Sequence, residues 1–145
     1  MESKQIRRTV TVKNEEETRS FGLSLGRQAR AGQILALSGD LGTGKTALTR
    51  YIAEGLGVRE TISSPTFTVI KEYESGRLPL YHFDVYRLSD PDELFNIGAY
   101  EYFDGEGLCV IEWAELIKDE LPPETEYIFI EYGQQEGERI YRCTF

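Results

Sequence analysis

The sequence predicts an α/β fold in three layers, with a mostly parallel central sheet, helices on both of its faces and an antiparallel hairpin at the C-terminal end. Strand and helix patterns alternate along most of the chain, as such a sheet requires. Leu108 to Ile111 is a continuous apolar run, which is typical of a strand covered on both faces, so we expect it to be central. Residues 127–132 and 138–145 flank the turn-like sequence GQQEG and indicate the hairpin.

The first part of the chain predicts a strand, a helix and a second strand. Thr9 to Lys13 reads as the first strand. Asn14 is a preferred N-cap residue, and Glu17 follows three residues later as in a capping box. We therefore expect a helix that ends near residues 31–32, where a glycine can close it. Residues 33–38 form the next strand and run into a glycine-rich loop.

The middle of the chain predicts a helix, a hydroxyl-rich loop broken by a proline, and two strands, at residues 45–56, 61–68, 69–73 and 80–86. Gly57 stops the helix. Ser89, Asp90 and Pro91 favour the start of another helix, because a capping side chain precedes a proline at the first helical position. We expect that helix to run to about Ile97.

The composition is that of an ordinary acidic globular protein, with 40% apolar residues and a formal charge of -9. A length of 145 residues is near the most common size of a single domain, so we expect one domain over residues 1–145. We also expect a cytoplasmic protein, because no apolar stretch approaches a membrane span and residues 1–8 lack the apolar core of a signal peptide. With 25 acidic and 16 basic residues, any contact with nucleic acid should be indirect. Cys109 and Cys143 are too few for a disulfide framework and should be buried thiols.

Residues 39–46 read Gly-Asp-Leu-Gly-Thr-Gly-Lys-Thr and meet in full the pattern of a phosphate-binding loop, between an apolar strand and a helix. The glycines allow successive backbone N–H groups to point at phosphate oxygens, and the start of the helix adds its positive end. This pattern predicts that ATP and Mg²⁺ bind here. The residues expected to hold the phosphates are Asp40, Leu41, Gly42, Thr43, Gly44, Lys45 and Thr46.

The loop predicts a metal site that needs a partner carboxylate. Lys45 supplies charge for the β- and γ-phosphates, and the Thr46 hydroxyl is placed for Mg²⁺. Glu112 ends the buried strand, so it should lie at the carboxyl edge of the sheet and is the favoured metal ligand or holder of metal-bound water. Asp84 is the second candidate and could hold Thr46 or orient the attacking water. For either carboxylate, a solvated acid at a strand end is the alternative.

Three further features have both a functional and a structural interpretation. The hydroxyl groups of Ser64 and Thr66, in the tetrapeptide SPTF, could reach the γ-phosphate or the metal as in a switch loop, or the segment is a turn fixed by proline. His82 is the sole histidine, and its strand neighbours favour a structural role. Trp113 could pack on the nucleotide, on a partner or in the core.

Four motifs taken together resemble one family. The motifs are GDLGTGKT, SPTF, HFDVYRL followed by DPDEL, and VIEW, at residues 39–46, 64–67, 82–94 and 110–113. In this order and spacing the chain resembles the TsaE family, also called YjeE, over residues 9–142. These are small bacterial ATPases of the threonylcarbamoyladenosine modification of tRNA.

The resemblance implies an ATPase that binds the TsaD–TsaB complex and supports its turnover, with tRNA contacted indirectly through that complex. TsaD and TsaB modify the adenosine beside the anticodon of tRNAs that read codons beginning with A. The resemblance also implies catalytic roles for Lys45, Asp84 and Glu112, and Mg²⁺ on Thr46 and Glu112. The region around Asn14 and the hairpin near Arg139 are the two candidates for adenine contacts.

Two other functions remain open. A small-molecule kinase shares the phosphate loop, although the chain leaves little room for a lid and an acceptor pocket. A nucleotide-sensing adaptor, in which hydrolysis is incidental, would show the same sequence. A GTPase is disfavoured, because the guanine-reading motif N-K-x-D does not occur in the chain.

Overall fold

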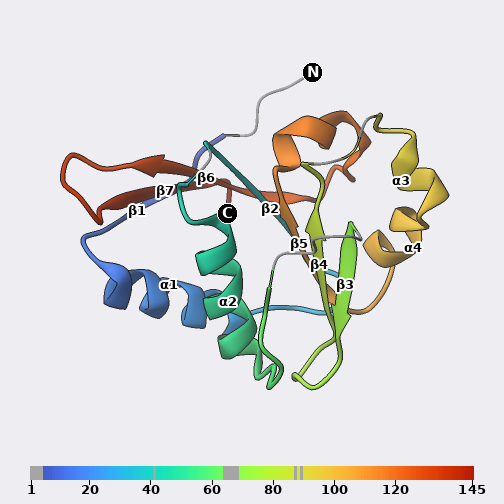
Figure 1. The fold of residues 1–145 in the computed structure, drawn as a ribbon, viewed down its shortest axis with the longest axis horizontal. Helices are drawn as coiled ribbons and strands as arrows, with labels where there is room; N and C mark the ends of the chain where they lie inside the picture. Colours follow the sequence, from blue (N-terminus) through green and yellow to red (C-terminus); the bar gives the residue numbers. More distant parts are fainter. Residues whose placement is uncertain (1–4, 41, 64–68, 87, 89) are drawn as a thin grey trace.

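A computed structural model describes residues 5–40, 42–63, 69–86, 88 and 90–145, and in these residues seven strands form one mixed sheet (Figure 1). The strands are β1 (Arg8–Val12), β2 (Ile34–Gly39), β3 (Ile70–Tyr73), β4 (Leu80–Asp84), β5 (Leu108–Glu112), β6 (Glu126–Tyr132) and β7 (Arg139–Cys143). The helices are α1 (Glu15–Arg27), α2 (Lys45–Leu56), α3 (Glu93–Asn96), α4 (Ala99–Phe103) and the 3₁₀ segment η1 (Ala114–Glu120).

The strand order is β1-β7-β6-β2-β5-β4-β3, with a parallel centre and antiparallel edges. Strand β2 pairs in parallel with β5 and β6, and β4 pairs in parallel with β5. Strands β6 and β7 form the C-terminal antiparallel hairpin, which β1 extends, and β3 lies antiparallel to β4 at the other edge. The predicted fold class, including the inner position of β5, is confirmed.

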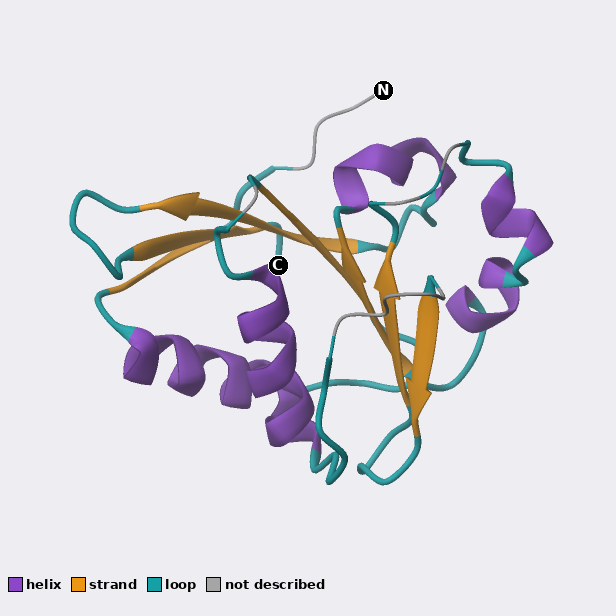
Figure 2. Cartoon of the chain, viewed as in Figure 1, coloured by secondary structure: helices purple, strands orange, loops and turns teal. Residues whose placement is uncertain are grey.

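Helices cover both faces of the sheet. Figure 2 shows α1 and α2 on one side and α3, α4 and η1 on the other. In β2, Leu35 and Leu37 pack with the α1–α2 layer, whereas Ile34 and Ala36 pack with the opposite layer. Alternate residues of a strand face opposite sides, so a strand with a helical layer on each side is apolar throughout. This is why β2 and β5 read as continuous apolar runs.

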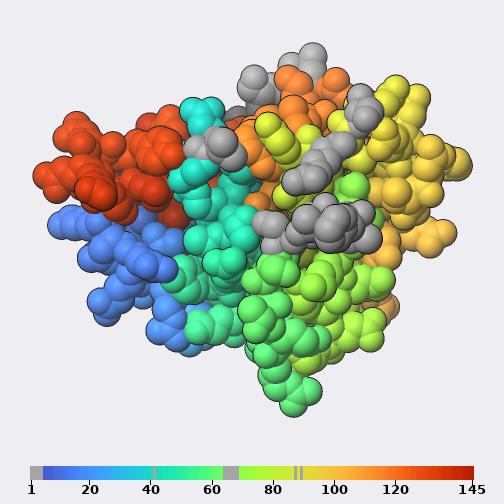
Figure 3. Space-filling view, viewed as in Figure 1, coloured from blue at the N-terminus to red at the C-terminus, as the bar shows by residue number. Residues whose placement is uncertain are grey.

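The first and the last strand of the chain lie side by side in the part of the sheet that forms one end of the molecule. Strand β1 pairs with β7 from Arg8 opposite Cys143 to Val12 opposite Arg139. Figure 3 shows the N-terminal segment in blue beside the C-terminal hairpin in red, with α3 and α4 in yellow at the other end.

Cys109 and Cys143 are both free and buried, as expected, and burial raises the pKa of the Cys109 thiol to about 12. In the described part, no helix is long and apolar enough to cross a membrane.

Helix α1 begins where the sequence predicts it but ends earlier. The Asn14 side chain accepts a hydrogen bond from the backbone N–H of Glu17, and the Glu17 carboxylate accepts one from the backbone N–H of Lys13. The helix ends at Arg27 rather than near residue 31. The Arg77 guanidinium, from the β3–β4 turn, donates hydrogen bonds to the carbonyl oxygens of Gly26 and Arg27 at the end of the helix and to that of Ala29 just beyond it.

The helix predicted from Pro91 to about Ile97 ends where expected, at Asn96 with Ile97 as the C-cap, but its predicted start is wrong. Helix α3 begins only at Glu93, because Asp90 first forms a turn in which its carboxylate accepts the backbone N–H of Asp92. Gly98 then adopts a left-handed conformation, with φ of 75°, and separates α3 from α4. Neither α4 nor η1 was predicted. Both are short, and what stabilises them is the packing of their apolar residues against distant parts of the chain.

Helices α1 and α2 cross at closely packed glycines. A Cβ atom added to Gly26 would lie 2.1 Å from the Ile52 carbonyl oxygen, and one added to Gly55 would lie 2.3 Å from that of Leu23. Both neighbours are backbone atoms, so they cannot move without displacing a helix. The close approach of α1 fixes α2, whose first turn forms the site described below.

We therefore expect Gly26→Ala to destabilise the fold by about 1–3 kcal/mol, because the overpacking outweighs the gain in helix propensity. The measurement is the urea midpoint of unfolding at an unchanged m-value. Ser20→Ala on the exposed side of the same helix is the matched control and should change stability by at most about 0.5 kcal/mol. Equal effects of the two substitutions would contradict the packing argument.

Candidate nucleotide and metal site

The phosphate loop joins β2 to α2 at the carboxyl edge of the parallel strands. Its two turns use glycines with positive φ, 83° at Gly42 and 98° at Gly44, a region that favours glycine. Gly44 is also the N-cap of α2, so the helix begins at Lys45. At the base of the loop, a Cβ atom on Gly39 would lie 2.7 Å from the Ile130 carbonyl oxygen. The loop is therefore packed against β6, and the positive N-terminal end of α2 lies at its C-terminal side.

Lys45 is folded back onto its own loop. Its Nζ atom donates hydrogen bonds to the carbonyl oxygens of Gly39, at 2.5 Å, and Asp40, at 2.9 Å. The same atom lies 3.9 Å from the centre of the Trp113 ring, and the residue is only 5% exposed. Burial lowers the pKa of Lys45, and four carboxylates oppose this effect, those of Glu115, Glu112, Asp40 and Asp84. The ammonium is thus held by carbonyl oxygens and an aromatic face.

Glu112 lies at the end of β5, directly below the first turn of α2. Its Oε1 atom accepts a hydrogen bond from the Thr46 hydroxyl at 2.8 Å. Its Oε2 atom lies 2.5 Å from Nε2 of His82 and 3.5 Å from Oγ1 of Thr49. The carboxylate is 2% exposed. The structure therefore brings together Thr46 and Glu112, the two residues predicted as metal ligands.

Asp84 lies beside Glu112 at the same edge of the sheet. The two residues are direct partners in the parallel pairing of β4 with β5. Asp84 is partly exposed, and its Oδ1 atom accepts the backbone N–H of Tyr86 at 3.1 Å. One carboxylate is thus buried against α2, while its neighbour faces more open space.

Trp113 forms a lid over the lysine. It follows Glu112 directly and has a φ of 63°, which is rare for a residue other than glycine. Its ring packs against Tyr86, with ring centres 4.7 Å apart, and against the Lys45 ammonium. Two of the sequence interpretations fit this position: the indole covers the lysine of the loop, and it also packs against the core cluster of the η1 side.

The C-terminal hairpin supports the loop from the other side. The Arg139 side chain donates through Nε to the Thr43 carbonyl oxygen at 2.9 Å, and its guanidinium lies 4.8 Å from the Tyr132 ring centre. A Cβ atom on Gly42 would meet the Tyr132 hydroxyl at 2.8 Å. The hairpin therefore contacts two positions of the loop and limits where its backbone can move.

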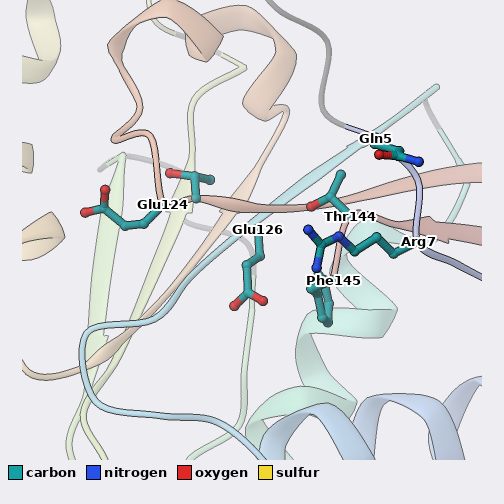
Figure 4. A pocket seen from close by; sticks show the side chains of 7 residues that line it. Gln5, Arg7, Glu124, Glu126, Thr144 and Phe145 are labelled. Atoms are coloured by element: carbon teal, nitrogen blue, oxygen red, sulfur yellow. The ribbon is translucent and has the colours of Figure 1, made fainter.

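Among the described residues, pockets lie near both ends of β6. One of about 250 Å³ borders the loop and is lined by Glu15, Thr18, Thr43, Gly44, Ala47, Gly137, Arg139 and Tyr141. The other, of about 310 Å³, lies at the opposite end of β6 (Figure 4). It has side chains of both charges, including Arg7, Glu124 and Glu126, and none of the predicted site residues. The first pocket is the one continuous with the phosphate loop.

Comparison with known proteins assigns the family. The family model described as "Threonylcarbamoyl adenosine biosynthesis protein TsaE" matches residues 12–141. The chain belongs to the TsaE family. It is 50% identical to the TsaE protein of Bacillus subtilis (strain 168) over 138 residues, which is 94% of this chain and 84% of that protein. It is 45% identical to the TsaE protein of Treponema pallidum (strain Nichols) over 113 residues, covering 78% and 83% of the two chains.

A solved structure confirms the architecture. The crystal structure of Bacillus subtilis YdiB matches with a TM-score of 0.77 and 41% sequence identity, covering 97% of this chain and 87% of that one. The likeness includes the mixed sheet with its parallel centre and antiparallel hairpin. The resemblance predicted from four motifs therefore extends over nearly the whole chain.

Most of the predicted site residues lie together in this TsaE-family fold. Asp40, Gly42, Thr43, Gly44, Lys45 and Thr46 form the loop, and Asp84 and Glu112 face it from neighbouring strands. Leu41, Ser64 and Thr66 lie outside the described residues. Sequence reasoning missed the contact of His82 with Glu112 and the contact of Arg139 with the loop. The first had a signal, because His82 and Asp84 are two apart on a strand and so share a face.

We expect Arg139→Ala to weaken nucleotide binding by roughly tenfold, since it removes a charged donor from a loop carbonyl. Arg142→Ala is the matched control, because Arg142 lies on the same strand but forms a surface pair with Glu131. The control should bind nucleotide within about twofold of the unmodified protein. Isothermal titration calorimetry with ATP measures both. A loss of affinity shared equally by the two variants would contradict the bracing role.

Proposed function

We propose that this chain is a Mg²⁺-dependent ATPase that supports the formation of threonylcarbamoyladenosine in tRNA by acting on the TsaD–TsaB complex. One observation supports this most: in a chain of the TsaE family, Lys45 of the phosphate loop lies next to the hydrogen-bonded pair of Thr46 and Glu112. The family and its relatives are named for the biosynthesis of threonylcarbamoyladenosine in tRNA, which supports the assignment to this pathway. Binding to TsaD–TsaB, and the need for ATP hydrolysis in the turnover of that complex, are what the resemblance to the TsaE family implies.

The backbone conformation and the charge of the loop both fit a nucleoside triphosphate. Gly42 and Gly44 have the positive φ angles that turn backbone N–H groups inward, and α2 begins at the loop with its positive end. Lys45 is the cation at the site, although in this conformation it binds the carbonyls of Gly39 and Asp40. In the proposed mechanism its Nζ atom leaves these carbonyls and binds the β- and γ-phosphate oxygens.

The donor set also fits Mg²⁺. The Thr46 hydroxyl and the Glu112 carboxylate are oxygen ligands, which this ion prefers, and phosphate and water complete its shell in sites of this kind. Within the described residues, no group of three or more histidine, cysteine and acidic side chains could hold a metal by itself. When bound, the ion would neutralise charge on the β- and γ-phosphates.

The two carboxylates have different proposed roles. Glu112 is buried and fixed by Thr46, so it holds the metal or a metal-bound water in one position. Asp84 is partly exposed beside it and orients the attacking water. Ser64 and Thr66 are proposed to respond to the γ-phosphate as part of a switch loop, and both lie outside the described residues.

In the described part of the structure, a pocket that borders the phosphate loop is the proposed site of the nucleoside. The pocket of about 250 Å³ begins at Gly44 and Ala47 in the first turn of α2 and is closed by Arg139 and Tyr141 of the hairpin. If the base binds in this pocket, the triphosphate lies along the phosphate loop. We propose that the adenine and ribose occupy it, which places the base near the hairpin rather than near Trp113.

The decisive experiment measures phosphate release from ATP by the purified chain with and without TsaD and TsaB. Release that depends on the two partners supports the proposal. Transfer of the γ-phosphate to a metabolite would support the kinase instead. A variant that hydrolyses no ATP but still sustains repeated modification turnovers would establish the nucleotide-sensing adaptor.

Lys45→Ala and Glu112→Ala should separate binding from hydrolysis. Lys45→Ala removes the cation and should weaken ATP binding by roughly 100-fold or more, since charged hydrogen bonds to several oxygens are lost. Glu112→Ala leaves the loop in place and should keep much of the binding while losing hydrolysis. Calorimetry and phosphate release measure the two quantities.

The exposed lysine Lys71 on β3 offers the control, and Lys71→Ala should leave both quantities within about twofold of the unmodified protein. Normal hydrolysis by Glu112→Ala would show that the metal assignment is wrong. Normal binding by Lys45→Ala would show that the loop is not the phosphate site.

Ala47→Leu should fill the nucleoside pocket. Because the added side chain occupies space beside the loop rather than in it, ATP affinity should fall by roughly tenfold, whereas the affinity for inorganic tripolyphosphate should change by no more than about twofold. Competition between each ligand and a fluorescent nucleotide measures this ratio. An equal loss for both ligands would mean that the substitution distorts the loop, and no loss for either would place the base elsewhere.

A further inference from the structure

His82 is a fully buried histidine that the proposed mechanism does not use. It is 0% exposed on β4, and its Nε2 atom lies 2.5 Å from Oε2 of Glu112. It is also the sole histidine of the chain. A buried polar side chain in direct contact with the proposed metal-binding carboxylate requires a physical account.

The parallel pairing of β4 with β5 explains why the two side chains meet. His82 is the partner of Val110, and Asp84 is the partner of Glu112. Residues two apart on a strand share a face, so His82, Asp84, Val110 and Glu112 all lie on the face covered by α2. The Glu112 side chain therefore has His82 on the adjacent strand, one step toward the sheet interior, and Thr46 on the helix above.

The hydrogen bonds of Glu112 divide between its two oxygens. Oε1 accepts the Thr46 hydroxyl at 2.8 Å. Near Oε2 there are two groups, His82 at 2.5 Å and Thr49 at 3.5 Å. Thr49 has one hydroxyl proton, and its better acceptor is the Lys45 carbonyl oxygen at 2.9 Å. His82 is therefore the donor to Oε2.

The surroundings also define the tautomer of His82. Among the described residues, Nδ1 of His82 has no hydrogen-bond partner. A neutral ring with its proton on Nε2 donates to Glu112 and leaves only a lone pair unsatisfied at Nδ1. A ring with its proton on Nδ1 would bury an unpaired N–H and present a lone pair to a carboxylate, which is the costlier arrangement.

We propose that His82 is a positioning residue, whose Nε2–H fixes the Glu112 carboxylate so that Oε1 faces Thr46 and the Mg-ATP. One hydrogen bond, from Thr46, leaves the carboxylate free to pivot about that contact. A second bond, from a ring that is locked in the sheet, fixes its plane. Metal sites depend strongly on such supporting hydrogen bonds, and losing one typically costs about 10–100-fold in metal affinity or activity. The inference rests on the proposed function, because it assumes that Glu112 serves the metal.

The test compares a substitution that removes the donor with one that keeps it. His82→Leu fills a similar volume without a hydrogen bond, whereas the amide nitrogen of His82→Gln reaches about as far as Nε2. The first measurement is Mn²⁺ affinity by electron paramagnetic resonance, with a non-hydrolysable ATP analogue at saturation. The second is the affinity of the analogue in EDTA, which does not involve the metal.

We expect His82→Leu to weaken Mn²⁺ binding by about 10–100-fold and His82→Gln to remain within about threefold of the unmodified protein. Affinity for the analogue in EDTA should stay within about twofold for both, because the loop is untouched. Thr49→Val is the matched control, since it removes the other group near Oε2, and it should bind Mn²⁺ within about threefold of the unmodified protein.

Several results would overturn the inference. Normal Mn²⁺ affinity in His82→Leu would do so, as would an equal loss in His82→Gln, because a merely structural histidine would show no rescue by a donor at this position. If His82→Leu does not fold by circular dichroism, His82→Asn replaces it, since its amide reaches Nδ1 rather than Nε2 and the same loss is expected.

Glu112→Ala distinguishes this inference from the proposed function. If Glu112→Ala binds Mn²⁺ as tightly as the unmodified protein, the metal assignment in the proposed function is wrong, and the role of His82 is wrong with it. If Glu112→Ala loses Mn²⁺ affinity while His82→Leu does not, the metal assignment stands and only the positioning role is wrong.

Discussion

The parallel alignment of β2, β5 and β4 is the constraint on which the site depends. Each strand ends at the same edge of the sheet with a different contribution: β2 with the glycine loop, β5 with Glu112 and β4 with Asp84. A slip of one residue between β4 and β5 would turn His82 and Asp84 to the opposite face. The register is held by the buried residues that alternate between the two helical layers, so the chemistry of the edge is set by packing in the core.

The second constraint is electrostatic. Lys45 and Glu112 are both almost fully buried, and a buried charge without partners is costly. Each is therefore surrounded by specific groups: carbonyl oxygens and the Trp113 ring for the ammonium, and hydroxyl and imidazole donors for the carboxylate. The lysine uses groups of its own loop, which a nucleotide can replace. The carboxylate of Glu112 is bound by His82 of the sheet, which cannot move as easily. This difference fits a lysine that moves when the nucleotide binds and a carboxylate that stays in place.

The sequence was informative wherever the signal is local or periodic. Helix α2 and its stop at Gly57, the Asn14 cap, the phosphate loop and the strand ending at Glu112 all follow from the order of nearby residues. The missed features depend on distant contacts. The early end of α1 depends on a guanidinium from the β3–β4 turn, and the short helix α4 on burial of its apolar residues. The bracing of the loop by Arg139 joins positions 96 residues apart, which no local pattern can show.

The self-bound lysine has a consequence for which anions can occupy the loop. An incoming ligand must replace the carbonyls of Gly39 and Asp40 and the aromatic face of Trp113 before it gains the ammonium. In the proposed mode of binding, a single phosphate ion would contact a small part of the loop, whereas a triphosphate would contact its whole length. Under the proposed function, these internal contacts compete with any anion for the ammonium, so a ligand that contacts more of the loop should displace them more readily than orthophosphate does.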